Sequence, residues 1–179
     1  MPAPSARTVS LQPYRPVDDR IVRSLEVQVD RSQSETLQLR YVLQGNLARL
    51  RIPPRKPAQR TDELWKHTCF EAFLRARDGA AYHELNVSPS TEWALYWFGG
   101  YRQGMAAAET LQPPAVTIER SAQQLSIGVG LDLKLLPPSR ALALAAVIEE
   151  ESGSLSYWAL AHPAGKPDFH HPDGFVFEI

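Results

Sequence analysis

The chain has 179 residues, of which 44% are hydrophobic and 22% are charged, and its formal net charge at pH 7 is −1. This length suits one globular domain, residues 1–179, with a core large enough to fold without disulfides. A charge so close to zero lacks the basic excess that binds phosphate backbones, so we expect no nucleic-acid partner. The sequence has no run of ~20 apolar residues and no apolar secretory leader, which predicts no membrane partner and a cytoplasmic location.

The first part of the chain predicts a series of short strands. Residues 1–7 are expected to form a loose N-terminal end, and residues 8–11 a short edge strand. Apolar and polar residues alternate through 25–29 and again through 36–44, a pattern typical of a β-hairpin with one buried face. Residues 47–52 are a third candidate strand with less regular spacing.

Residues 62–102 are the most distinctive stretch, because they hold three of the four tryptophans and the only cysteine, Cys69. The alternation of side chains predicts neighbouring strands over 68–75, 81–88 and 91–98. The first of these is apolar on both faces. We therefore expect Cys69 to be a buried, unreactive thiol.

Three polar side chains interrupt these apolar strands. Glu71 is the exception on its strand, and Glu84 and Asn86 occupy alternate positions of the next one. If the strand registers agree, the three groups meet in one patch on a single face of the sheet. We predict that they line a ligand pocket. A glycosidase-like acid–base pair of Glu71 and Glu84 is the alternative.

The second half of the chain predicts more strands. Residues 103–112 have an alanine-rich, helical composition but are few, and residues 116–131 predict a hairpin. Residues 140–151 fit either a helix or a strand, and we predict a strand because the surrounding segments are strands. Further strands are predicted over 154–161 and 175–179.

Short strands joined by regular turns predict an all-β fold. We expect an antiparallel β-sandwich, immunoglobulin-like or jelly-roll-like, of about nine to eleven strands. The sequence contains no Gly-x-Ser-x-Gly elbow, phosphate loop or dinucleotide fingerprint. We therefore expect a binding protein and not an enzyme.

Residues 162–174, HPAGKPDFHHPDG, form a second functional candidate, because prolines restrict this polar loop and so preorganise it. The spacing of its histidines and aspartates matches no standard zinc motif. We predict no metal site, and a divalent ion that supports metal-assisted chemistry is the alternative. The candidate ligand-binding residues of the loop are His162, Lys166, Asp168 and His170.

Two tryptophans are candidates for stacking on a flat ligand. Trp65 and Trp158 lie near junctions of loops and strands among polar residues, whereas Trp93 and Trp97 have the apolar neighbours of core residues. Arg102, at the end of the aromatic stretch, is a further polar candidate for the ligand site.

Two segments of this sequence resemble a known family. The segment ELWKHTCFEAFL, followed by YHELNVSPSTEW, resembles the strand pair of DOMON-like domains related to family 9 carbohydrate-binding modules. In that pair a tryptophan precedes a glutamate by six positions, here Trp65 and Glu71, and an aromatic-rich strand with an Asn and a Pro follows, here residues 82–89. The ending SYWALAHPAGKPDFHHPDGF resembles the closing segment of bacterial stand-alone members of the group.

The resemblance implies an antiparallel β-sandwich that binds a sugar or haem without catalysing a reaction. In the carbohydrate-binding relatives, a sugar ring lies between two tryptophans and charged groups hold its hydroxyls. Trp65 and Glu71 match that motif. We assign Trp158 to the second wall because it lies just before the polar loop.

Haem binding is the alternative that the resemblance leaves open, as a cytochrome-like electron-transfer domain. Haem-binding relatives use a methionine and a histidine as axial ligands, which here would be Met105 with His162, His170 or His171. Met105 lies in no matching motif. The resemblance therefore favours a carbohydrate or another sugar-containing small molecule, with no cofactor.

Overall fold

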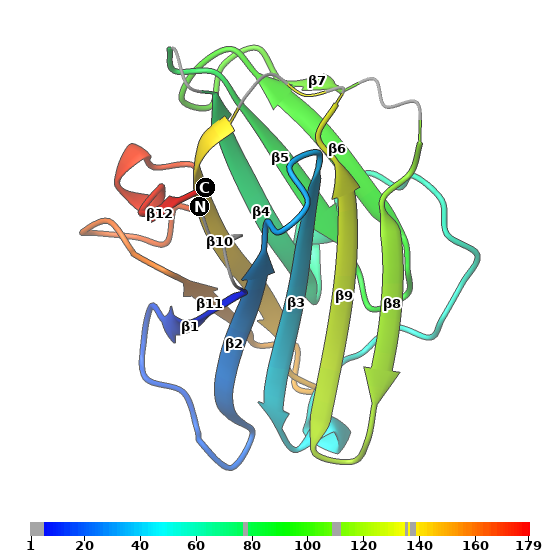
Figure 1. Cartoon of the computed structure of the whole chain (residues 1–179). Coiled ribbons are helices and arrows are strands. Elements are labelled where there is room, and N and C mark those ends of the chain that lie inside the picture. Colours follow the sequence, from blue (N-terminus) through cyan, green and yellow to red (C-terminus); the bar gives the residue numbers. More distant parts are fainter. Residues whose placement is uncertain (1–5, 77–78, 109–111, 135, 137–138) are drawn as a thin grey trace.

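The computed structural model describes residues 6–76, 79–108, 112–134, 136 and 139–179. Strands make up 51% of the structure and helices 5%, so the all-β prediction is confirmed. The strands pair antiparallel and form two facing layers of a sandwich or half-barrel (Figure 1). The described residues contain twelve strands, slightly more than predicted. Two of them, β7 and β12, are only two residues long.

The front sheet has the strand order β1-β2-β3-β9-β8. Its strands are β1 (Arg7–Pro13), β2 (Val22–Asp30), β3 (Thr36–Gly45), β9 (Gln124–Asp132) and β8 (Ala115–Arg120). The back sheet has the order β7-β6-β5-β4-β10-β11, and β12 pairs with β10. Its strands are β7 (Ala106–Ala107), β6 (Trp93–Phe98), β5 (Tyr82–Val87), β4 (Cys69–Ala76), β10 (Ser139–Glu149), β11 (Leu155–Ala159) and β12 (Phe177–Glu178).

Strand β1 connects the two sheets. Its residues 7–11 pair with β2 in the front sheet, and Gln12 and Pro13 pair with β11 in the back sheet. The prediction of an edge strand was therefore wrong, and Arg7 belongs to the strand and not to a loose end. The partner on the second side, β11, is too distant in the sequence for local patterns to reveal. Residues 1–5 of the predicted loose end lie outside the described part of the chain.

The alternation of residues along β10 fixes the two faces of the back sheet. Leu142, Leu144 and Ile148 point into the core between the sheets, where their side chains are fully buried. Ala143 and Ala145 point to the opposite, outer face and belong to a second apolar cluster. The prediction of a strand over 140–151 is confirmed by β10. Alternate residues of a strand point to opposite faces, and here both faces are buried, which explains why apolar residues occupy both sets of positions.

Three predicted elements differ in the structure. Residues 47–52 contain the 3₁₀ helix η1 (Leu47–Arg49) instead of a strand, because the Asn46 side chain caps it by accepting a hydrogen bond from the Ala48 N–H (3.2 Å). The described part of 103–112 contains β7 and no helix, and residues 109–111 lie outside the described part. The closing strand is shortened to β12.

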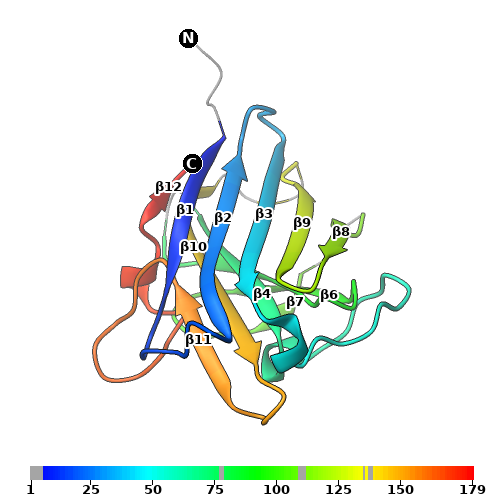
Figure 2. The ribbon, with the colours of Figure 1, turned by 90° about the horizontal axis from the view of Figure 1, so that it is seen from below.

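The C-terminal segment covers part of the outer face of the back sheet (Figures 1 and 2). There Phe175 packs with Phe73, Tyr82 and Phe98 in the second apolar cluster. Two short 3₁₀ helices, η2 (Leu64–Lys66) and η3 (Pro172–Gly174), lie next to the same sheet. In the described residues no helix is long and apolar enough to cross a membrane.

Candidate ligand-binding site

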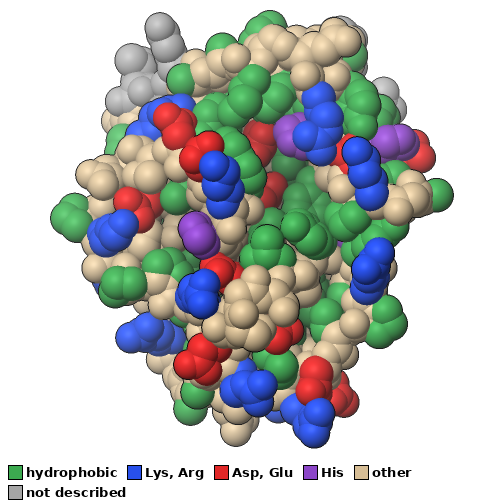
Figure 3. Space-filling model, turned by 180° about the vertical axis from the view of Figure 1, so that it is seen from behind, with side chains coloured by type: hydrophobic (Ala, Val, Ile, Leu, Met, Phe, Trp, Pro, Cys, Tyr) green, Lys and Arg blue, Asp and Glu red, His purple; other side chains and the backbone are tan. Residues whose placement is uncertain are grey.

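A cavity of about 580 Å³ opens on the outer face of the back sheet, beside the C-terminal segment. Figure 3 shows this side of the molecule, with a hollow surrounded mainly by hydrophobic side chains and acidic side chains within it. Its volume lies in the range of small-molecule sites. The residues that line it are Trp65, Lys66, Glu71, Glu84, Phe98, Arg102, Met105, Val147, Leu155, Tyr157, Pro167, Asp168, Phe169 and His170.

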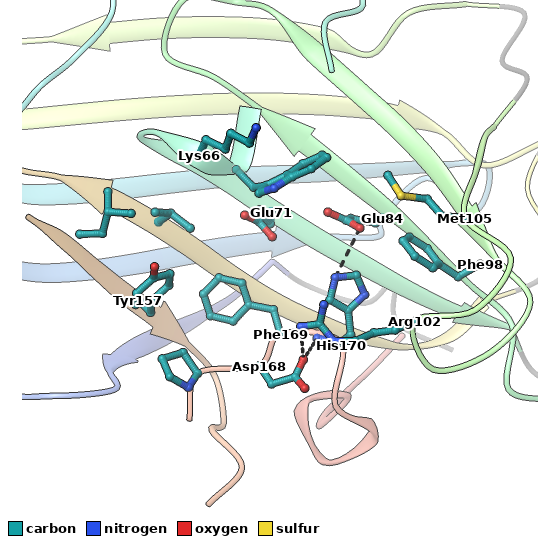
Figure 4. Close-up of a pocket in the computed structure, with 14 residues that line it drawn as sticks. Lys66, Glu71, Glu84, Phe98, Arg102, Met105, Tyr157, Asp168, Phe169 and His170 are labelled. Carbon is teal, nitrogen blue, oxygen red and sulfur yellow. Dashed lines mark hydrogen bonds and ion pairs between the residues drawn. The ribbon is translucent and has the colours of Figure 1, made fainter. Parts of the chain in front are cut away.

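Strand register brings the predicted polar patch together. On β4 and β5, Glu71 lies opposite Asn86, and Glu84 lies opposite Phe73, so all four side chains share the outer face. On the other side of β4, Glu71 lies opposite Ala145 of β10. This small residue leaves room above the sheet, and the carboxyls of Glu71 and Glu84 point into the same space (Figure 4).

Glu71 is buried without a basic partner. Its side chain lies in the cavity wall with the residue only 3% exposed, and its Oε1 atom has no hydrogen-bond partner in the described part of the chain. Burial, together with the nearby Glu84 charge, raises the pKa of Glu71 well above its ordinary value. Both effects favour the protonated form of this carboxyl.

Glu84 is 4% exposed and accepts a hydrogen bond from Asn86 Nδ2 at 2.8 Å. Its Oε2 atom is 3.7 Å from His170 Nε2. Burial raises the pKa of Glu84 to about 7, although the Asn86 hydrogen bond and the Arg102 charge act in the opposite direction. The Oδ1 atom of Asn86 is buried and has no partner in the described structure. Because Asn86 does not line the cavity, the acceptors available to a ligand there are those of Glu71 and Glu84.

Arg102 and Asp168 form one wall by joining two loops. An Arg102 Nη2 donates to Asp168 Oδ1 at 2.7 Å, and the hydroxyl of Tyr101 also donates to Asp168. Burial would raise the pKa of Asp168, but these hydrogen bonds lower it, so the carboxylate is ionised. Arg102 has a left-handed backbone, with φ of 53°, and its N–H donates to the Tyr82 hydroxyl at 3.2 Å.

His170 is a neutral part of the wall. Burial lowers its pKa to about 4. Its Nδ1 atom is 2.7 Å from the Tyr82 hydroxyl, and its ring meets Phe73 and Phe98 edge-on, each with 5.1 Å between ring centroids. These contacts hold the ring firmly against the sheet.

Aromatic rings form much of the remaining wall. The Trp65 ring packs edge-on against Tyr96 with 5.8 Å between centroids, and the Tyr96 hydroxyl donates to Asp62 at 2.6 Å. On the opposite side, Tyr157 packs against Phe169 with 6.1 Å between centroids. Trp65 therefore lies in the wall of a cavity, and its contact with Tyr96 holds its ring in place.

Four predicted site residues do not line the cavity. Asn86 lies beside Glu71 and Glu84 on the sheet but is fully buried outside the cavity lining. Trp158 points to the inner face of β11, into the core, and its Nε1 donates to Ser156 Oγ at 3.0 Å. His162 contacts the Gln12 carbonyl oxygen at 2.8 Å, and Lys166 is exposed; neither lines the cavity. The second wall is therefore not Trp158. It comes from Tyr157, because neighbouring strand residues point to opposite faces.

Several lining residues were missed from the sequence. Phe98 and Tyr157 each lie one position away from a tryptophan. Knowing which face of the sheet each strand residue occupies would have identified them as lining residues. Phe169 lies inside the polar loop and was passed over among its histidines. The alternation of leucine and alanine in β10 was a further signal, because small outward side chains leave space for a ligand.

Two geometric observations concern the alternatives of a metal ion and haem. They contain no group of three or more His, Cys, Asp or Glu side chains that could hold a metal. Met105 and His170 do line the same cavity, but both ring nitrogens of His170 already face Tyr82 and Glu84. Axial ligation of haem would require these contacts to break, so the residues do not fit that group.

Comparisons with known proteins support the fold. No protein-family model matches this sequence, and no curated protein matches it. The chain is similar to the crystal structure of a candidate carbohydrate-binding protein from Bacteroides uniformis, with a TM-score of 0.66 and 11% identity over 95% of this chain and 84% of that one. At an identity this low, the structural similarity shows a shared fold and nothing more. Membership of the DOMON-like group stays a prediction.

Proposed function

We propose that this chain is a non-catalytic binding protein whose ligand is a carbohydrate or another sugar-containing small molecule. The observation that carries this proposal is the outer-face cavity, which combines aromatic rings with buried carboxyl groups. A sugar ring presents an apolar C–H face and a rim of hydroxyls. Trp65 and Tyr157 would contact the former, and Glu71 and Glu84 would hydrogen-bond the latter.

Two further observations support a carbohydrate. The unpartnered Glu71 Oε1 atom is an acceptor in the cavity wall that a ligand hydroxyl can satisfy, which relieves the cost of burying it. In addition, the similar structure from Bacteroides uniformis is described as a candidate carbohydrate-binding protein.

A calorimetric titration with a panel of mono- and disaccharides tests the proposal. A saccharide at 100 times its dissociation constant should also raise the free energy of unfolding by ~2.7 kcal/mol. Trp65→Ala should weaken binding at least tenfold. The matched control is Trp97→Ala, because Trp97 is 38% exposed and does not line the cavity. No binding across the panel, or equal loss in both variants, would contradict the proposal.

Acid–base catalysis on a glycoside is a second candidate function, favoured by the pKa of Glu84. A carboxyl with a pKa of about 7 suits a general acid, and Glu71 lies nearby on the adjacent strand. Release of nitrophenol from a panel of nitrophenyl glycosides, abolished in Glu84→Gln, would show this activity. Binding without turnover would support the non-catalytic proposal.

A further inference from the structure

Two of the three carboxyls that line the cavity, those of Glu71 and Glu84, have no charged basic partner, although basic side chains lie near them. Lys66 pairs with Glu63 at 2.8 Å, and Arg102 pairs with Asp168 at 2.7 Å. The ring of His170 is neutral, and its Nε2 is 3.7 Å from Glu84. Each basic group in the described wall is thus paired with another acid or uncharged.

Unpaired carboxyls at this depth lower the stability of the fold. Glutamate is almost never fully buried unless it is paired, and removing a carboxylate from water costs several kcal/mol. Glutamine or an aliphatic residue would fill the same outward positions of β4 and β5 at lower cost. Buried acids without partners in a cavity are instead typical of functional sites.

The surroundings of the carboxyls fit a cation. The walls carry the rings of Trp65, Phe98, Tyr157 and Phe169, and aromatic faces attract cations. Glu71 and Asn86, which are directly opposite each other, each have a buried oxygen without a partner, and Glu84 is the diagonal neighbour. An alkylammonium group has three N–H donors and no acceptor, which suits the carboxyl oxygens that Glu71 and Glu84 present in the cavity.

We propose that the cavity binds a ligand that carries a protonated amine, with the ammonium group held by the carboxyls of Glu71 and Glu84. This inference rests on the proposed function, and together they specify an amino sugar with a free amine. The sugar ring lies against the aromatic walls. The amine supplies the positive charge that no side chain of the described wall provides to these carboxyls.

Binding of such a ligand releases protons near neutral pH, because an ammonium group favours the ionised carboxyls. The other titratable groups near the pair are Tyr41, Lys66, Cys69, Tyr82, Arg102, Tyr157, Asp168 and His170. Lys66, Arg102 and Asp168 are in ion pairs, and burial raises the pKa of Cys69 and of Tyr82 and lowers that of His170 to about 4. Released protons therefore come from Glu71 and Glu84.

Calorimetric titration of the full chain at about pH 6.5, where primary amines are protonated, tests this inference with four probes. D-Glucosamine carries ring and amine, D-glucose and N-acetyl-D-glucosamine carry the ring without a basic amine, and cyclohexylamine carries the amine without hydroxyls. We expect glucosamine to bind at least tenfold more tightly than the two neutral sugars. Repeating each titration in buffers of different ionisation enthalpy measures the protons exchanged on binding. Binding of glucosamine should release protons, and binding of the neutral sugars should not.

Variants separate the carboxyls from general effects of charge. Glu71→Gln and Glu84→Gln should each remove most of the preference for glucosamine over glucose. Glu119→Gln, which removes an exposed acid of β8 in the front sheet, should retain it. Both cavity variants keep the side-chain shape and remove an unfavourable buried acid, so we expect them to fold.

The possible outcomes distinguish this inference from the proposed function. Equal affinity for glucosamine and the neutral sugars overturns the amine inference and leaves the carbohydrate proposal in place. Binding of cyclohexylamine and glucosamine but of no neutral sugar supports the amine and contradicts a general saccharide site. Binding of none of the four probes overturns both.

Discussion

At the scale of single residues, Glu84 makes the stability of the unliganded chain depend on pH. Its pKa is raised from 4.5 to about 7 in the folded state, so the folded chain holds a proton that the unfolded chain has lost between these values. The Glu84 contribution therefore lowers the free energy of unfolding as pH rises from about 4.5 to 7. Above pH 7 the loss is complete, at about 3 kcal/mol.

Glu84→Gln should remove this dependence. We expect its free energy of unfolding to exceed that of the wild type by up to about 3 kcal/mol at pH 8 and by much less at pH 4.5. Urea denaturation at several pH values measures the difference. A variant that is less stable than the wild type at pH 8 would show that the carboxyl has a stabilising partner.

The two candidate tryptophans should respond differently to truncation. Trp158 is buried between the sheets, so Trp158→Ala should lower the free energy of unfolding by about 3–5 kcal/mol. Trp65 lies in the wall of an open cavity and is only partly buried, so Trp65→Ala should cost clearly less. Chemical denaturation of both variants checks this. Similar losses would place Trp65 in the structural core.

At the scale of the element, β10 serves the core with one face and the site with the other. Leu144→Ala opens a hole between the sheets and should cost about 2–5 kcal/mol. Val147 lines the cavity from the outer face, so Val147→Phe should fill it and weaken saccharide binding at least tenfold. The cost of that larger side chain to stability should be about 1–3 kcal/mol. Melting curves and calorimetry distinguish the two effects.

The same strand shows what sequence patterns could reveal. Period-two alternation identified β2, β3, β9 and β10, because each has at least one face buried in the core. It could not assign β1 to two sheets, since the pairing with β11 joins residues far apart in the sequence. It also mistook η1 for a strand, because three irregularly spaced apolar residues fit either structure.

The sequence could predict the lining residues of the cavity only where it indicated which face of the sheet a strand residue occupies. Glu71, Glu84 and Asn86 were identified as a patch because they interrupt apolar strands, and the register brings them together. Trp158 was assigned by its distance from the loop instead of by its face, which placed it one residue away from Tyr157. The fold of the loop decides that Asp168 and His170 line the cavity while His162 and Lys166 do not.

At the scale of the whole molecule, the C-terminal segment closes the cavity by its contacts with distant parts of the back sheet. Asp168 accepts hydrogen bonds from Arg102 and Tyr101 of the loop after β6, and also from the His170 N–H at 3.1 Å. Phe169 and His170 then lie over the sheet as part of the cavity wall. The Asp168 carboxylate is therefore the main polar link between the segment and that loop.

Asp168→Asn should loosen this link. We expect the free energy of unfolding to fall by about 1–3 kcal/mol, since Arg102 is half exposed and can turn to water. Because the folded-state pKa of Asp168 is lowered, its contribution is present above pH 3.8 and is lost as pH falls through the folded-state value. The variant and the wild type should therefore converge in stability in acid.

The same variant should weaken the cavity more than the core. Amide hydrogens of residues 160–176 should exchange faster, and affinity for a bound saccharide should fall about tenfold, whereas protection of β3 and β9 should change only by the global loss of stability. Asp173→Asn is the control, because Asp173 is exposed in the same segment and its carboxylate contacts His171 Nδ1 of that segment, at 3.6 Å. Unchanged exchange in 160–176 in Asp168→Asn would mean that apolar contacts of Phe169 and Phe175 alone hold the segment on the sheet.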